Sequence, residues 1–417
     1  MREKHGKQPT VDPKIKESVR KFIRAIPRIE SHYLRAQTKR EYIESGKSLA
    51  DLHRDYKEER ERQRLPAAHI VMFNRIFNEE FNISFYIPKK DQCDLCESYK
   101  NADEEEKKKL VVAYNNHLNQ KELSRQEKDT DKKNQNGTYV AVYDLQAVMP
   151  VPKGLVSSFY YTSKLNYCFF WNETEGKRGA IEIGSCVLSY ISMLVEKVNK
   201  PNEIDIIFYS DNCCGQQKNK YLLTTYAYAL QKFNVRRIEH KFLICGHSQN
   251  EGDNIHSVIE KQISRHLKSG PIYIPEQYST LIRTAKKNGT PYRVHDLTNE
   301  DFFDLKLLQE EWGNNFNVAV DRKKVNWHDI KILKVEKEHP HSFFFKTSYS
   351  DTEFKKVIVK KSKKSQEDFS SVQLVPAYSK KLPLTDAKNK ALQSLCEKNI
   401  IKKPYYELFY KNIFDLR

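Results

Sequence analysis

Short runs of aliphatic and aromatic residues alternate with stretches of helical periodicity between residues 138 and 267. Apolar runs bounded by polar turns are typical of strands, and apolar positions three or four residues apart are typical of helices that cover a sheet. The pattern predicts three strands, then a helix, a strand, a helix, a strand and a helix, which indicates an α/β core with a mixed sheet flanked by helices. The predicted strands cover 138–146, 157–163, 166–171, 204–209 and 241–245, and the predicted helices cover 181–198, 217–233 and 253–267.

The regions on either side of this core have different patterns. Residues 13–80 have helical periodicity, and residues 103–136 are almost wholly charged and polar, which predicts an exposed helix that runs into a flexible linker. Beyond residue 290, helical stretches and three strand-like runs predict a small basic α+β region. We therefore predict three domains, at 1–136, 137–290 and 291–417.

Three acidic residues lie where the predicted strands end or the next helix begins. Asp144 and Asp211 end two strands, and Asp253 opens the helix that follows a third. The carboxyl ends of neighbouring strands meet at the crevice where α/β sheets bind ligands. Carboxylates suit Mg²⁺ or Mn²⁺, and two such ions about 3.5–4 Å apart can hold both the attacking and the leaving oxygen of a phosphodiester. Each acid also has an ordinary structural explanation, as a strand-end turn, an Asx-turn and a helix N-cap respectively.

The pair Cys93-x-x-Cys96 has the spacing of half a zinc site. No second cysteine pair with matching spacing follows, so the remaining Zn²⁺ ligands have to be histidines. His117 lies on the next predicted helix, and His32 is the candidate fourth ligand; a pair of reduced thiols without metal is the alternative. Several other cysteines lie within apolar patterns, which predicts buried thiols in a reducing compartment and no disulfide framework.

The formal net charge is +17, from 72 Lys and Arg against 55 Asp and Glu. An excess of this size favours a polyanionic partner, nucleic acid before membrane, although a basic surface kept for solubility is the alternative. The candidate contacts open the helix after Asp211 or lie on a lysine-rich strand, which is also explained as a charged sheet edge. These candidates are Gln217, Lys218, Lys355, Lys356, Lys360 and Lys361. No apolar run approaches the roughly 20 residues of a transmembrane helix, and residues 1–10 are unlike a signal peptide.

Four segments of the chain carry a resemblance to a known family. They are IPRIESHY at 26–33, PKKDQCDLC at 88–96, FYSDNCCGQQKN at 208–219 and GHSQNEGDNIH at 246–256. Together with the order of strands and helices, they resemble a large, mostly uncharacterised family that is multiplied in animal genomes and derived from a DNA transposon. Its catalytic core is similar to the ribonuclease H-like core of DDE/D transposases and retroviral-type integrases. The resemblance extends from about residue 5 to near the C-terminus.

The resemblance implies Mg²⁺-dependent cleavage and joining of DNA strands at transposon ends, in the nucleus. It makes Asp144 the first metal-binding acid, Asp211 the second and Asp253 the third, with Glu251 and Glu260 as competitors for the third position. If the three carboxylates spread beyond about 8 Å, they cannot share two ions about 4 Å apart. The oligomeric state is left open, a homo-oligomer included, and so is the presence of a DNA-binding domain upstream of residue 1.

Two histidines, His247 and His256, flank the third acid and can contact phosphate or steady that acid, although buried structural histidines are common. The main alternative function is a domesticated, catalytically inactive protein that binds DNA or chromatin through the same basic surfaces. A ribonuclease or repair nuclease on the same fold is a third interpretation.

Overall fold

The computed structural model divides into two compact units, Met1–Gln92 and Cys93–Arg417. The residues that the structure describes are 12–28, 41–43, 48–85, 93–134, 137–145, 149–150, 155–162, 167–199, 201–247, 251–359 and 369–416. This division differs from the predicted boundaries after residues 136 and 290, because the helices that follow Cys93 and the strands beyond residue 290 both pack into the larger unit.

The smaller unit is built from helices with a short parallel strand pair. Its elements are α1 (Pro13–Ala25), β1 (Glu41–Ile43), α2 (Leu49–Arg62), α3 (Ile70–Glu80) and β2 (Ile83–Phe85). Asp12 caps α1, and Ser48 forms a capping box with Asp51 at the start of α2. The helices bury Val19, Tyr56 and neighbouring apolar side chains in one core, as the helical periodicity of 13–80 predicts.

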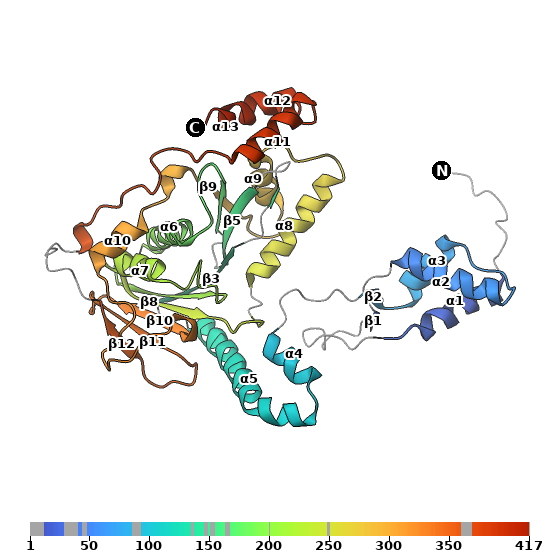
Figure 1. Ribbon diagram of the computed structural model, residues 1–417, viewed down its shortest axis with the longest axis horizontal. Coiled ribbons are helices and arrows are strands. Elements are labelled where there is room, and N and C mark those ends of the chain that lie inside the picture. The colour runs from blue at the N-terminus through green and yellow to red at the C-terminus, as the bar shows by residue number, and fades with distance from the viewer. Residues whose placement is uncertain are drawn as a thin grey trace. The chain divides into compact units, whose positions relative to one another are not determined.

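The larger unit contains a mixed sheet with helices on both faces (Figure 1). Its strands are β3 (Thr138–Leu145), β4 (Met149–Pro150), β5 (Leu155–Thr162), β6 (Tyr167–Asn172), β7 (Ile204–Ser210), β8 (Val235–Phe242), β9 (Arg293–Asp296), β10 (Ile332–Glu336), β11 (Ser342–Lys346) and β12 (Lys355–Ile358). Its main helices are α4 (Asp94–Asn101), α5 (Glu104–Lys133), α6 (Ala180–Val198), α7 (Lys220–Lys232), α8 (Glu251–Leu267), α9 (Pro275–Thr284), α10 (Leu305–Trp312), α11 (Asp386–Glu397), α12 (Lys403–Tyr405) and α13 (Lys411–Phe414). The predicted α/β core with a mixed sheet flanked by helices is therefore confirmed.

The sheet has the strand order β12-β11-β10-β8-β7-β3-β5-β6-β9, with β4 paired to β5. In its centre β3, β7 and β8 are parallel, whereas β5 runs antiparallel to β3 and to β6. Later segments extend both edges, since β9 pairs with β6 and β10 pairs with β8. The strands predicted as part of a small C-terminal β unit thus continue the central sheet.

One face of the sheet carries the main hydrophobic core. The helices α6, α7 and α10 cover this face and bury Tyr143, Phe208, Trp171 and Trp312. A second core lies between β6 and the helices α8 and α9, where Cys168 and Phe170 are buried. The C-terminal helices α11 to α13 form a further cluster with Ile274, at the start of α9.

Helix α5 packs on the opposite face of the sheet through charged side chains. Lys241 of β8 is 3% exposed, and its ammonium donates to Glu127 (2.6 Å) and Asp131 (2.7 Å) of α5. The hydroxyl of Tyr209 also donates to Asp131, at 2.5 Å. The first half of α5 has no buried residue, as the prediction of an exposed helix in 103–136 expects. The second half, from Gln120 onward, is instead packed against the rest of the larger unit, because partners elsewhere in the chain neutralise its charges.

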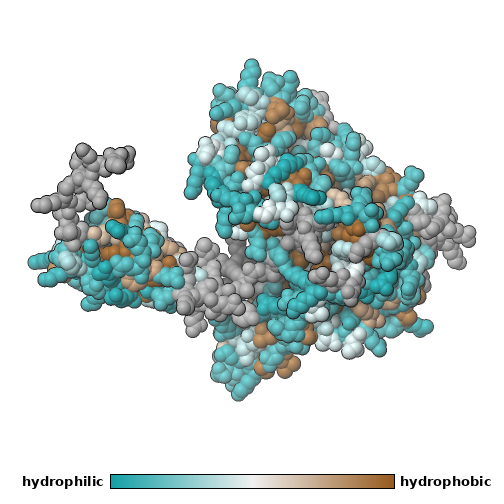
Figure 2. Space-filling model, turned by 180° about the vertical axis from the view of Figure 1, so that it is seen from behind, coloured by the Kyte–Doolittle hydropathy of each residue, from teal (hydrophilic) through white to brown (hydrophobic). Residues whose placement is uncertain are grey.

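Hydrophilic residues predominate on the face of the molecule drawn in Figure 2, with apolar residues scattered between them. Over the ranges that the structure describes, no helix has the length and apolar character needed to cross a bilayer. All eight cysteines are free thiols.

Candidate functional site

Two of the three predicted acids lie side by side at the carboxyl edge of the sheet. In the parallel pair β3 and β7, Val142 is the register partner of Tyr209. Asp144 and Asp211 each follow two residues later, on strands that lie about 4.8 Å apart. Strand pairing alone therefore brings together two carboxyl groups that are 67 positions apart in the sequence.

The third acid comes from helix α8, which packs against β3 and β5. Asp253 lies in the first turn of this helix, and His256 follows one turn later. One ligand atom each of Asp144, Asp253 and His256 lie within 4.8 Å of one another. The helix thus adds a carboxylate and an imidazole to the sheet edge, and this set of side chains can hold a divalent cation. Asp211 is not part of this set, so the structure brings two of the three predicted acids together with His256, while Asp211 lies on the neighbouring strand.

The carboxyl groups at this edge are electrostatically coupled. Burial raises the pKa of Asp144 to about 7, and the negative charge of Asp211 is the second cause of this shift. The Leu145 amide, which donates to this carboxylate at 2.8 Å, acts in the opposite direction and lowers the pKa. The charge of Asp253 adds to the shift. Burial also raises the pKa of Asp211, against a hydrogen bond from the Cys213 amide. A cation bound here would offset the cost of keeping these groups ionised.

A buried polar network supports the strand end that carries Asp211. The Ser210 hydroxyl donates to the carbonyl of Asp211 at 2.8 Å and also meets His240 Nε2 at 2.8 Å. Tyr226 contacts the other ring nitrogen of His240 at 3.1 Å. Burial lowers the pKa of His240 well below its usual value, so the ring is neutral and can accept from Tyr226 while it donates to Ser210.

The two competing acids on α8 occupy different surroundings. Glu251 accepts from Lys128 of α5 at 2.7 Å and is also paired with Lys132. Although burial opposes ionisation, these lysines lower the pKa of Glu251 to about 2. Glu260 is exposed, about two turns beyond Asp253. Asp253 is thus the α8 carboxylate that lies with Asp144, and Glu251 is committed to α5.

Gln217 and Lys218 lie in the turn before α7 rather than on the helix, and both are 1% exposed. The Lys218 ammonium donates to the carbonyl of His328 at 2.9 Å, and burial lowers its pKa to about 8. Neither amide atom of Gln217 has a hydrogen-bond partner among the described residues. The predicted nucleic-acid contact of these side chains stays a prediction, and it requires the turn to open.

The basic strand β12 borders a hollow of about 450 Å³. Lys355 lines this hollow together with Lys323, Lys324 and Lys331, while two acids, Asp321 and Asp329, reduce its positive charge. The side chain of the neighbouring Lys356 lies over the ring of Phe344, 5.4 Å from its centroid. Lys360 and Lys361, the other two contacts predicted from the lysine-rich run, lie outside the described residues.

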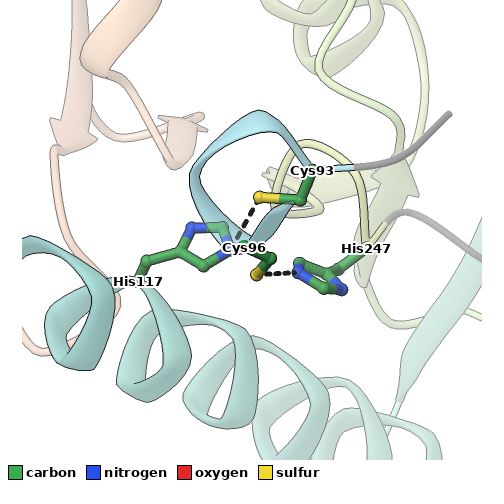
Figure 3. Close-up of side chains that lie close together, drawn as sticks. All are labelled: Cys93, Cys96, His117 and His247. Carbon is green, nitrogen blue, oxygen red and sulfur yellow. Dashed lines mark hydrogen bonds between the residues drawn. The ribbon is translucent and has the colours of Figure 1, made fainter. Parts of the chain in front are cut away.

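A second cluster of metal-ligating residues includes the predicted cysteine pair. Cys93 Sγ lies 3.2 Å from His117 Nε2, and Cys96 Sγ lies 3.3 Å from His247 Nε2 (Figure 3). One ligand atom from each of the four side chains falls within 4.8 Å of the others. His32, the candidate fourth ligand from the sequence, lies outside the described residues, and the place beside Cys96 is taken by His247.

Sequence reasoning placed His247 beside the acids rather than beside the thiols. The signal that could have found it is the Gly246-His247 pair directly after a buried strand, since glycine permits a sharp turn and a close approach of the backbone. His256 was placed beside the third acid, and it does lie with Asp144 and Asp253.

Comparison with known families finds one similarity. Residues 166–357 match the model of a domain of unknown function, DUF7869. The match covers less than half of the chain and extends from the start of β6 into β12, so it includes Asp211, His247 and Asp253 but neither Asp144 nor the cysteine pair. No curated protein and no solved structure matches the chain.

Proposed function

We propose that the chain is a transposase-like enzyme that cleaves and joins DNA strands in the nucleus, with a ribonuclease H-like core that uses Mg²⁺ or Mn²⁺. The observation that carries this proposal is the meeting of Asp144 with Asp253 beside β7, the parallel strand that Asp211 directly follows. The element order from β3 to α8 also supports it, because the order is the one that the family resemblance implies.

The residues fit a hard divalent cation, since their donor atoms are mainly carboxylate oxygens. Burial raises the pKa values of Asp144 and Asp211, and a bound cation would favour their ionised forms. Asp144 and Asp253, with His256 beside them, would hold the metal. Asp211 would join them only after a side-chain movement, because its carboxylate is not among the ligand atoms that lie within 4.8 Å of one another. Mg²⁺ in such a site supplies stabilisation of the attacking and leaving oxygens of a phosphodiester. The chain's own residues position these acids: strand pairing fixes Asp144 against Asp211, and the Ser210–His240 contact holds the end of β7.

Two further features support nucleic acid as the substrate. The net charge of +17 favours a polyanion, and four lysines surround the hollow beside β12. Phosphate contacts of this kind give an affinity that falls steeply with salt. The same features would also serve the alternative function, a domesticated protein that binds DNA or chromatin without cleaving it.

The test is a nicking and strand-transfer assay on DNA carrying the element's own flanking ends, with Mg²⁺ or Mn²⁺. We expect metal-dependent product from the wild type, a loss of at least about 100-fold in Asp211→Ala, and normal activity in Glu260→Gln, since Glu260 is exposed and lies outside the acidic cluster.

Three other results would overturn the proposal. If the chain binds DNA without cleaving it, if salt weakens this binding, and if Asp211→Ala leaves it unchanged, the chain is a domesticated binder. Cleavage of RNA in a hybrid duplex but not of DNA would identify a ribonuclease. Cleavage that Asp211→Ala retains would place the chemistry elsewhere in the chain.

A further inference from the structure

Four potential metal ligands converge from three separate segments of the larger unit. Cys93 is the N-cap residue of α4 and Cys96 lies in the first turn of the same helix, so both thiols leave the helix at one end. His117 projects from the middle of α5, and His247 comes from the segment after β8 (Figure 3). The four side chains point toward a common centre.

The spacing of these ligand atoms suits a tetrahedral zinc ion. With Zn–S near 2.3 Å and Zn–N near 2.0–2.1 Å, the ligand atoms of a tetrahedral Cys₂His₂ site lie about 3.3–3.8 Å apart. The two measured sulfur–nitrogen distances are 3.2 and 3.3 Å, and all four ligand atoms fall within 4.8 Å of one another. Shifts of less than about 1 Å, within the reach of side-chain rotation, would complete the tetrahedron.

The surrounding backbone is shaped for this approach. Gly246 has a φ of +72°, and a Cβ atom at this position would lie 2.5 Å from the Cβ and 2.6 Å from the Cα of Cys93. A residue with a side chain cannot occupy this position without displacing the α4 backbone. The glycine thus lets the His247 segment pass directly against the residue that supplies the first thiol.

A stacked tyrosine pair holds α4, which carries Cys93 and Cys96, against α5, which carries His117. The rings of Tyr99 and Tyr114 are 3.9 Å apart and nearly parallel, at 5°. Tyr99 lies one turn after Cys96 on α4, and Tyr114 lies one turn before His117 on α5. The stack therefore sets the register in which the thiol pair faces the imidazole.

The ligand types select the metal. Two thiolates and two imidazoles form a soft donor set that suits Zn²⁺ and disfavours Mg²⁺. Because four protein ligands fill a tetrahedral shell, the site leaves no position for water or substrate, which is the arrangement of a structural zinc site rather than a catalytic one.

We propose that Cys93, Cys96, His117 and His247 bind a structural zinc ion that fastens the α4–α5 hairpin to the segment between β8 and α8. The ion pairs of Glu251 with Lys128 and Lys132 join α5 to the start of α8 a few residues further on. Together, the two attachments hold both ends of the connection that leads to Asp253. This consequence for Asp253 rests on the proposed function, whereas zinc binding does not.

Metal content of the purified full-length chain tests the proposal without DNA or activity. We expect about one zinc ion per chain in the wild type, and a loss of at least 10-fold in zinc retained after dialysis in Cys96→Ser and His247→Asn. The matched control is Cys245→Ser, because this exposed cysteine lies two residues from His247 and outside the cluster. Its zinc content should equal that of the wild type.

A second measurement on the wild type covers variants that fail to fold. Thiol alkylation followed by mass spectrometry should label Cys93 and Cys96 only after a chelator removes zinc, whereas Cys245 should react in both states. Cobalt added to the zinc-free chain should produce a thiolate-to-metal absorption band. A wild type that neither contains nor binds zinc, or equal labelling of Cys93 and Cys96 with and without chelator, would overturn the zinc site and leave the nicking assay as a separate question.

Discussion

The two clusters of potential metal ligands in the larger unit differ in the chemistry of the groups that face one another. At the acidic edge, burial raises the pKa values of Asp144 and Asp211, and the negative charge of Asp211 adds to the shift of Asp144. In the cysteine–histidine cluster each thiol faces an imidazole nitrogen. Buried carboxyl groups with raised pKa values are typical of a site that binds an exchangeable ion or substrate, and a closed set of four thiol and imidazole ligands is typical of a site that maintains structure.

The largest expected effect is at the acidic edge, where a substitution should lower activity without lowering stability. If the proposed function holds, Asp144→Asn should lower metal-dependent nicking by at least about 100-fold. The substitution would remove a ligand of the proposed metal, and loss of a second-shell partner alone typically costs about 10–100-fold. The thermal unfolding midpoint should stay unchanged or rise, since the substitution removes the repulsion between Asp144 and Asp211. Nicking assays and thermal unfolding on the same preparation measure both effects. A variant that loses stability together with activity would remove the contrast between the two clusters.

At the cysteine–histidine cluster, a substitution is expected to lower stability. Gly246→Ala should lower the free energy of unfolding by about 2–4 kcal/mol, because the new methyl group meets the Cys93 backbone and the positive φ disfavours alanine. Urea unfolding of the zinc-bound chain measures this change. Gly215→Ala is the control, since a Cβ there has no other atom within 4 Å, and it should change stability by less than about 1 kcal/mol. Equal stability of Gly246→Ala and the wild type would show that the close approach to Cys93 is dispensable.

The smallest effect concerns Lys218 and pH. Its pKa is about 8 in the folded chain, against about 10.4 for an unperturbed lysine, so between these pH values the unfolded chain binds more protons. Stability should therefore rise with pH from 8 to 10.4 through this group, and the charged Lys218 should cost stability below pH 8. Lys218→Met should remove this part of the rise and stabilise the chain at pH 7 by about 1–2 kcal/mol.

Urea unfolding at pH 7 and pH 9.5 measures the change at Lys218. Lys232→Met is the control, because Lys232 is exposed at the end of α7 and its replacement should leave the pH dependence as it is in the wild type. If Lys218→Met destabilises the chain at pH 7, the hydrogen bond from the Lys218 ammonium to His328 stabilises the fold by more than the burial of the charge costs.

The sequence was informative where structure is determined locally. The apolar runs before Asp144 and Asp211 predict β3 and β7, and parallel pairing then places both acids at one edge. The spacing of Cys93 and Cys96 likewise predicts a thiol pair, because both residues lie at the start of one helix.

Features that depend on distant partners were not predictable in the same way. Helix α5 has the composition of a solvated linker, and its second half is packed because Lys241, 110 positions after Asp131, neutralises the acids there. Cys96 and His247 are 151 positions apart, and no periodicity or spacing rule relates them. The pairing of β10 with β8 is equally invisible in the local pattern, since it depends on which sheet edge is left open once the central strands have formed.

The strands β9 and β10, which extend the sheet beyond β6 and β8, limit how the chain can be divided for experiments. A fragment covering 137–290 would retain all three acids but would lack β9 and β10, the strands that pair with β6 and β8. Both outer strands would then present unpaired backbone N–H and C=O groups, which are templates for intermolecular pairing. Such a fragment is expected to aggregate on expression. A fragment that begins before Cys93 and continues to the C-terminus keeps β6 paired with β9 and β8 paired with β10, and it contains every residue of both clusters of potential metal ligands.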